Sequence, residues 1–144
     1  MGMTEAGRWE HRSRARRRAL QALYQWQMTR QPADEIIPQF LETQDFTGVD
    51  TGLFRELVSG VIAADEALAE RLAPCLDRPL AQCDVMERVI LLMGAWQLLH
   101  DAELPHQIIL EECVDLARRF GSDQSPGFVN GVLDHAARQF REPA

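Results

Sequence analysis

The stretch from Asp84 to Leu99 carries the most apolar helical pattern in the chain. Its apolar residues recur at helical spacing along two stripes, formed by Val85, Val89, Leu92, Trp96 and Leu99 and by Met86, Ile90 and Met93. Asp84 stands at the N-cap position, and Glu87 follows three residues later, as in a capping box. A helix with two apolar faces needs neighbouring elements on both faces. We therefore expect this helix to lie at the centre of the fold.

The residues before this central helix also place apolar side chains at helical spacing. This spacing predicts helices over 12–29, 35–43 and 51–72. The first helix should end before Gln31, because a residue that precedes proline is pushed out of the helical region. Asp34 is expected to cap the second helix.

Two further helices are predicted after the central one. Pro105 fits the first position of the next helix, and Gly121 fits a left-handed cap at its end. Ser125 and Pro126 fit the N-cap and first position of the last helix. No stretch forms a convincing strand pattern. The sequence therefore predicts an all-α bundle of six or seven helices joined by short links.

The length of 144 residues suits one domain with a self-sufficient core. Residues 1–11 have no apolar periodicity, so we predict a flexible N-terminal tail there. Residues 12–141 then form a single helical domain.

A run of arginines opens the first predicted helix. Residues 1–30 have a net charge of +5, whereas residues 31–144 have a net charge of −12. The arginines crowd the N-terminal half of the helix, which the helix dipole disfavours, and they surround it on all sides. We expect its first turns to fray until a polyanion neutralises them, because guanidinium groups bind phosphate oxygens. An acidic protein surface and a solubilising tail remain alternatives. The run consists of Arg12, Arg14, Arg16, Arg17 and Arg18.

Several kinds of catalytic chemistry have no support in the sequence. The chain contains no lysine, which excludes a phosphate-binding loop with its lysine and a Schiff base. The four histidines form no metal-binding motif, and no G-x-S-x-G nucleophile motif occurs. We therefore expect no enzyme activity, no metal and no cofactor.

The cysteines and the longest apolar run indicate the compartment. Cys75, Cys83 and Cys113 are odd in number and form no C-x-x-C pair, so free thiols in a reducing compartment are expected. The longest apolar run, from Val89 to Trp96, is far shorter than the roughly 20 residues of a membrane span. The sequence thus predicts a soluble cytoplasmic protein without a membrane partner.

Side chains suited to nucleobases occur near the arginine run and at the start of the last helix. Aromatic rings stack on bases, and amides contact base edges. Taken alone, Phe128 is better explained as a core residue, and Asn130 as a residue that forms hydrogen bonds within a helix. The candidates are Tyr24, Gln124, Ser125, Phe128 and Asn130.

Four segments together resemble one protein family. They read RRRALQALYQW at 16–26, FRELVSG at 54–60, LARRFGSD at 116–123 and FVNGVLD at 128–134. These segments are similar to the NusB family of bacterial transcription antitermination factors, and the resemblance extends over nearly the whole chain. It departs from the family pattern at Cys75, Gln124 and Gly127.

The resemblance implies an all-helical domain that binds boxA RNA jointly with NusE, a small-subunit ribosomal protein. The complex then joins elongating RNA polymerase and suppresses termination during ribosomal RNA synthesis. The acidic remainder of the chain suits a basic ribosomal partner. Whether the chain forms a homodimer is left open. By position, the implied RNA contacts are Arg12, Arg14, Arg16, Tyr24, Glu87, Gln124, Ser125 and Phe128, to which the arginine run adds Arg17 and Arg18.

Two alternative functions, from other classes of protein, also remain open. A helix-turn-helix regulator of DNA also uses cationic helices, but it needs a recognition helix with base-reading side chains. A domain of this type is also fused to some ribosomal RNA methyltransferases, but no G-x-G-x-x-G cofactor motif occurs here.

Overall fold

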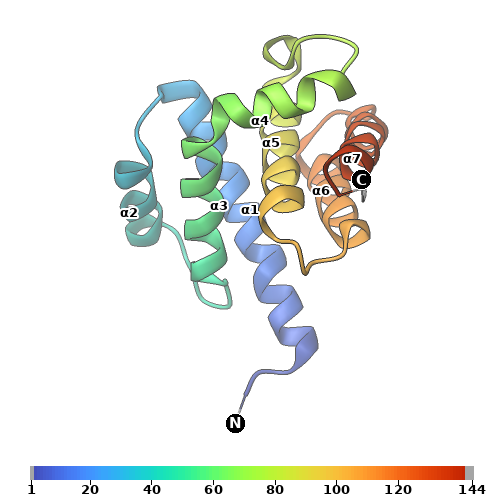
Figure 1. Cartoon of the computed structure of the whole chain (residues 1–144). Coiled ribbons are helices and arrows are strands. Elements are labelled where there is room, and N and C mark those ends of the chain that lie inside the picture. Colours follow the sequence, from blue (N-terminus) through green and yellow to red (C-terminus); the bar gives the residue numbers. More distant parts are fainter. Residues whose placement is uncertain (1, 142–144) are drawn as a thin grey trace. The chain divides into compact units, whose positions relative to one another are not determined.

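The computed structural model describes residues 2–141, which form seven α-helices and two short 3-10 helices (Figure 1). No strand occurs within residues 2–141, so the predicted all-helical fold is confirmed. The chain divides into two compact units at the Ala63–Ala64 bond. The first unit contains α1 (Glu5–Thr29), α2 (Ala33–Thr43) and α3 (Thr51–Ala63). The second contains α4 (Asp65–Leu72), η1 (Ala73–Cys75), η2 (Leu80–Gln82), α5 (Val85–His100), α6 (His106–Phe120) and α7 (Ser125–Arg141).

The first unit is a three-helix arrangement in which α1 runs beside α3, and α2 packs against both (Figure 1). The predicted apolar stripe of α1 is buried, including Leu23 and Trp26. Phe54 of α3 is fully buried and contacts two other rings, those of Phe40 at 6.1 Å and Phe46 at 4.8 Å between ring centroids. These aromatic contacts join α3 to α2 and to the loop that follows α2.

The start of α1 differs from the prediction. The helix begins at Glu5, not near residue 12, because Thr4 is its N-cap and the Thr4 side chain accepts a hydrogen bond from Gly7 N at 3.0 Å. Glu5 adds a favourable negative charge to the first turn. Residues 5–11 are exposed or half-buried, so no apolar periodicity marks them. Of the tail predicted over 1–11, Met1 lies outside the described residues. The end of α1 at Thr29 agrees with the prediction.

The second and third predicted helices also differ in detail. The N-cap of α2 is Pro32, and Asp34 lies in the first turn instead of capping the helix. The helix predicted over 51–72 is two helices, because Ala64 leaves the helical conformation with φ −103° and ψ 11°. Asp65 and Glu66 favour a new helix start there, since their carboxylates lie in the first turn of α4. The apolar spacing continues across Ala64, so periodicity alone does not reveal the break.

The most apolar helix, α5, is the central helix of the second unit, as predicted. It packs against α4, α6 and α7 (Figure 1). Its two apolar stripes are largely buried, including Val89, Ile90, Leu92 and Met93. The two 3-10 helices, η1 and η2, occupy the predicted turn between α4 and α5. Within the described part of the chain, no helix is both long and apolar enough to cross a membrane.

Three predictions about the two ends of α6 and the start of α7 are wrong. Pro105 is the N-cap of α6 and not its first residue, and α7 includes Ser125 itself. Gly121 has φ −97° and ψ −169°, which is extended and not left-handed. Glycine is needed there for close approach, because a Cβ atom at Gly121 would lie 2.7 Å from both Cβ and Oγ of Ser125 and 2.8 Å from the carbonyl oxygen of Ala117.

Candidate nucleic-acid interface

The arginine run of α1 is mostly at the surface, but not entirely. Arg12 and Arg14 are exposed, and Arg17 and Arg18 are half-buried. Arg16 is only 3% exposed, so the prediction that charge surrounds this part of the helix on all sides is wrong. Arg16 borders the apolar stripe of α1, and a long aliphatic stem allows such a side chain to be buried.

Two of these arginines hold the loop between α2 and α3. Nη1 of Arg14 donates to the carbonyl oxygen of Gly48 at 3.3 Å, and Nη2 of Arg18 donates to that of Asp45 at 3.1 Å. Gly48 has φ 71°, a left-handed conformation that favours glycine. A Cβ atom there would also collide with Nη1 of Arg14. The loop is therefore shaped to receive guanidinium groups from α1.

A hollow of about 240 Å³ lies between α1 and this loop. Hydrogen bonds from the backbone N–H and side chain of Thr47, together with Arg18, lower the pKa of the Asp45 carboxyl.

Glu10 pairs with two of the arginines, at 3.3 Å from Arg14 Nε and 3.6 Å from Arg17 Nη2. Both ion pairs are partly exposed, so another anion can replace Glu10 at modest cost. The hollow is lined by Arg14, Arg17, Arg18, Asp45, Thr47 and Val49.

A second hollow of about 380 Å³ adjoins the first, since Val49 lines both. The carbonyl oxygen of His11 accepts a hydrogen bond of 3.0 Å from Asp50 N, which ties this part of α1 to the loop. Arg12 lines this hollow together with Arg8, which the sequence analysis left in the predicted tail. The Thr4–Glu5 helix start was the signal that would have placed Arg8 on the helix. The remaining lining residues are Met3, His11, Asp50 and Thr51.

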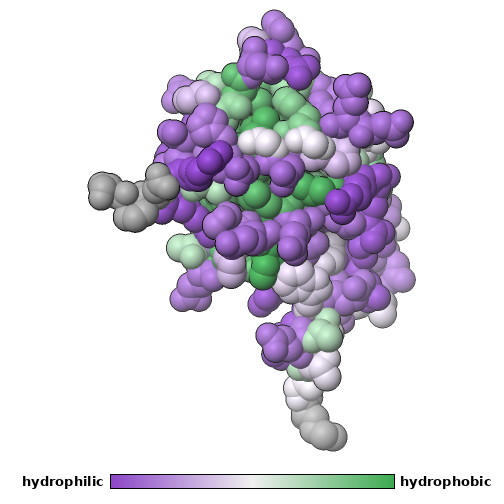
Figure 2. Space-filling view, turned by 90° about the vertical axis from the view of Figure 1, so that its right-hand side faces the viewer, coloured by the Kyte–Doolittle hydropathy of each residue, from purple (hydrophilic) through white to green (hydrophobic). Residues whose placement is uncertain are grey.

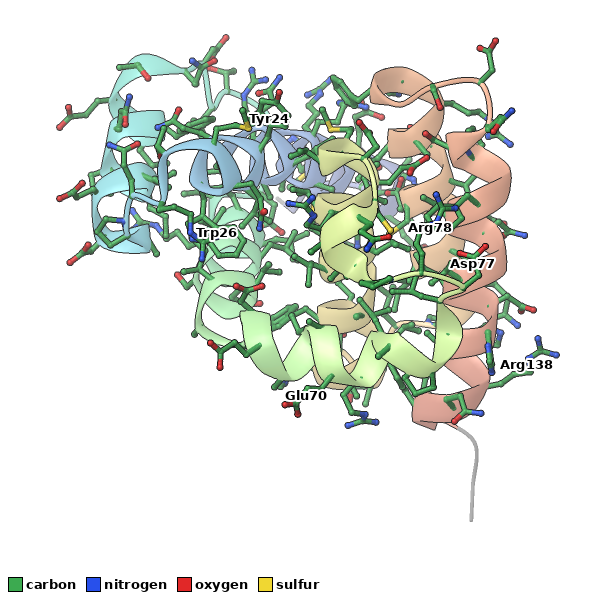
Figure 3. The ribbon with its side chains drawn as sticks, turned by 90° about the horizontal axis from the view of Figure 1, so that it is seen from above. Tyr24, Trp26, Glu70, Asp77, Arg78 and Arg138 are labelled. Atoms are coloured by element: carbon green, nitrogen blue, oxygen red, sulfur yellow. The ribbon has the colours of Figure 1, made fainter. Side chains whose placement is uncertain are left out.

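Tyr24 lies farther along α1, with 39% of its surface exposed. Figure 3 shows Tyr24 and Trp26 on opposite sides of the helix, and Trp26 is buried. The Tyr24 ring is therefore accessible for stacking on a base.

The remaining predicted contacts belong to the second unit, where Glu87 and Ser125 meet. Asp84 caps α5 by accepting a hydrogen bond from Glu87 N at 3.4 Å, as predicted. The Glu87 carboxylate, however, accepts a hydrogen bond of 2.7 Å from Ser125 Oγ, so it is directed to α7 and not back to Asp84. Ser125 Oγ also accepts from Ser122 N at 3.0 Å. Ser125 is fully buried, so its hydroxyl positions the start of α7.

Phe128 lies one turn after Ser125 and is half-buried. The guanidinium carbon of Arg78 lies 4.8 Å from the centroid of its ring. Arg78 comes from the loop between η1 and η2, and Figure 3 shows it beside Asp77. Sequence reasoning missed Arg78, because no periodicity in that loop indicates where its side chain points. Gln124 is exposed just before α7.

Asn130 is separated from this group. It is exposed on α7 and lines a groove of about 530 Å³ between α6 and α7, together with Leu110, Val114 and Arg118. Figure 2 views the side of the molecule on which α6 and α7 lie in Figure 1, and it shows hydrophobic residues exposed between hydrophilic ones.

The other predicted contacts form two groups. The first group lies on α1 in the first unit and consists of Arg12, Arg14, Arg16, Arg17, Arg18 and Tyr24, of which Arg16 is buried. The second group lies at the start of α7 in the second unit and consists of Glu87, Gln124, Ser125 and Phe128.

Comparisons with known proteins agree with the resemblance seen in the sequence. The model of the NusB family matches residues 13–138. The transcription antitermination protein NusB of Halorhodospira halophila is 46% identical over 132 residues, covering 92% of this chain and 84% of that protein. The same-named protein of Psychromonas ingrahamii is 41% identical over 130 residues, covering 90% of each.

Solved structures share the fold. The structure of T. maritima NusB has a TM-score of 0.79 at 25% identity and covers 88% of this chain and 90% of that one. A structure of the antitermination factors NusB and NusE in complex with double-stranded RNA has a TM-score of 0.80 at 19% identity and covers 95% of this chain and 100% of that one.

Proposed function

The chain belongs to the NusB family, and from this premise we propose that it is a transcription antitermination factor. In this role it binds boxA RNA of ribosomal RNA operons together with the ribosomal protein NusE. The complex then joins the antitermination complex of elongating RNA polymerase in the cytoplasm. The names of the relatives at 41% and 46% identity support this proposal.

The observation that carries the RNA-binding part is the pair of adjoining hollows between α1 and the loop before α3. Five arginines line them, of which Arg8, Arg12 and Arg14 are exposed and Arg17 and Arg18 are half-buried. Guanidinium groups bind phosphate oxygens through two contacts at once, and each neutralised phosphate releases counterions. Such a surface suits the backbone of an RNA strand.

The role that we propose involves binding and no covalent step. RNA is held by ion pairs to the arginines of α1 and by stacking on Tyr24. In this role the protein acts by holding RNA and protein partners together in a complex. It does not convert a substrate into a product.

A gel-shift titration tests the proposal. The whole chain is titrated against a single-stranded boxA RNA, a scrambled RNA of equal length, the same RNA as a duplex and a DNA duplex, each with and without purified NusE. We expect the boxA strand to bind tightest and NusE to increase its affinity. Equal affinity for the scrambled RNA, or preference for the DNA duplex, would contradict the proposal.

A further inference from the structure

Arg78 and Phe128 form a contact that brings a loop of the second unit onto the start of α7. The guanidinium carbon lies 4.8 Å from the ring centroid, within the range of a cation–π interaction. The Arg78 side chain is nevertheless 45% exposed. A base that approaches Phe128 from this side therefore meets the guanidinium group before it meets the ring.

The guanidinium group is held in place from two directions. Its Nε donates a hydrogen bond of 3.1 Å to Oδ1 of Asp77, and one face of the guanidinium group lies over the ring of Phe128. The chain after Arg78 is fixed by Arg88, which donates to the carbonyl oxygens of Leu80 at 3.2 Å, of Ala81 at 2.9 Å and of Cys83 at 3.1 Å. These contacts restrict the conformations of the Arg78 side chain before any ligand binds, which reduces the entropy lost on binding.

The local charge indicates what kind of contact this group makes. Asp77 pairs with Arg78 and offsets its charge, and Glu87 adds a further carboxylate nearby. A phosphate gains little from a site in which two carboxylates lie close to the guanidinium group. A nucleobase, in contrast, stacks on the plane of an arginine and is attracted without net charge.

We propose that Arg78 is a base-stacking residue, with Phe128 as its support, and that it holds an unpaired base of the bound RNA. This inference rests on the proposed RNA-binding function. It adds a residue that the sequence comparison did not indicate, and it changes the role of Phe128, whose ring supports the stack from behind instead of touching the base.

The test compares four variants with the wild-type chain bound to single-stranded boxA RNA in the presence of NusE. They are Arg78→Ala, Arg78→Lys, Phe128→Ala and the control Arg71→Ala. Arg71 is a matched control because its guanidinium lies 4.7 Å from the ring of Phe140, in the same unit but on α4 and the end of α7. Thermal unfolding of each variant is measured alongside.

We expect Arg78→Ala to weaken RNA binding roughly tenfold, which is within the range expected when one base is no longer stacked. The slope of affinity against salt should stay as in the wild type, because every phosphate keeps its partner. Arg78→Lys should remain weak, since lysine keeps the charge but has no planar group. Phe128→Ala should weaken binding similarly, and Arg71→Ala should bind as the wild type does. A 2-aminopurine base placed along the RNA should lose fluorescence on binding the wild type but less on binding Arg78→Ala.

Other outcomes overturn the inference. Wild-type affinity in Arg78→Ala would show that the residue does not contact RNA. A reduced salt slope in Arg78→Ala, restored by Arg78→Lys, would show a phosphate contact instead of a stack. Absence of RNA binding by the wild-type chain would mean that the proposed function itself fails, and the inference with it.

Discussion

Ser125 Oγ donates a hydrogen bond of 2.7 Å to Oε2 of Glu87, and so joins the first turn of α7 to the first turn of α5. The same hydroxyl accepts from the backbone N–H of Ser122, in the connection that leads into α7. The two helix starts are therefore fixed to each other through one buried hydroxyl group. Gln124 and Phe128, two of the predicted RNA contacts, flank this point.

Ser125→Ala tests how much this hydroxyl contributes to stability. The substitution leaves the Glu87 carboxylate and Ser122 N–H without this partner, so we expect the free energy of unfolding to fall by about 1–3 kcal/mol. Urea denaturation measures the change. Ser59→Ala, at an exposed position of α3, is the control and should change stability by less than about 0.5 kcal/mol. A loss no larger than that of the control would show that the hydrogen bond contributes nothing net.

Gly121→Ala tests the close approach between the end of α6 and the start of α7. The added Cβ would lie 2.7 Å from Ser125 and 2.8 Å from the Ala117 carbonyl oxygen, so the backbone has to shift. We expect a destabilisation of about 1–3 kcal/mol by thermal or urea unfolding. Gly127→Ala is the matched control, because no heavy atom lies within 4 Å of a Cβ built there. Alanine favours the helix, so this control should stabilise by up to about 1 kcal/mol.

Arg141 closes the C-terminal end of α5. Its guanidinium group donates to four carbonyl oxygens, those of Gln97 at 3.4 Å, Leu98 at 2.9 Å, Asp101 at 2.7 Å and Leu104 at 2.6 Å. Gln97 and Leu98 lie in the last turn of α5 and Asp101 is its C-cap, so a cation there interacts favourably with the negative end of the helix and serves as a cap. We expect Arg141→Ala to lower the free energy of unfolding by about 1.5–3 kcal/mol, as for hydrogen bonds to a charged group.

Arg138→Ala is the control for this measurement. Arg138 forms an exposed i,i+4 ion pair with Asp134 at 3.1 Å, and Figure 3 shows its side chain directed away from the helices. An exposed pair of this kind contributes about 0.5 kcal/mol or less. Equal losses in the two variants would mean that Arg141 does not act as a cap.

Asp45 should titrate below its usual range. The N–H of Thr47 donates to Asp45 Oδ1 at 2.9 Å, and this bond, the Thr47 side chain and Arg18 lower the carboxyl pKa. Because the folded pKa lies below the unfolded one, the stabilisation is present above the unfolded pKa and is lost as the pH falls through the folded pKa. An NMR titration of the carboxyl carbon measures the value. Thr47→Val should raise the pKa only partly, since the backbone N–H remains, whereas an unshifted wild-type pKa would contradict the assignment.

The arginines of α1 should set the salt dependence of RNA binding. Arg12 and Arg17 are the suitable pair to replace, because Arg14 and Arg18 also hold the loop and Arg16 is buried. The double substitution to alanine should lower boxA affinity and reduce the log–log salt slope by about 0.7 for each phosphate of a single strand that is no longer neutralised. Arg55→Ala, exposed on α3, should leave the slope unchanged. An unchanged slope in the double variant would remove Arg12 and Arg17 from the interface.

The sequence by itself determined the helical class, most helix positions, the central place of α5 and membership of the NusB family. Helical periodicity depends on residues three and four positions apart, so it can be read from any short stretch. Only the tertiary structure decided that Arg16 is buried, that Glu87 bonds to Ser125 instead of Asp84, and that Gly121 is needed for close approach. It also placed Arg78 on Phe128, which lies far from it along the chain. Contacts between distant residues depend on how helices pack and how loops turn, and no local pattern of residue types encodes them.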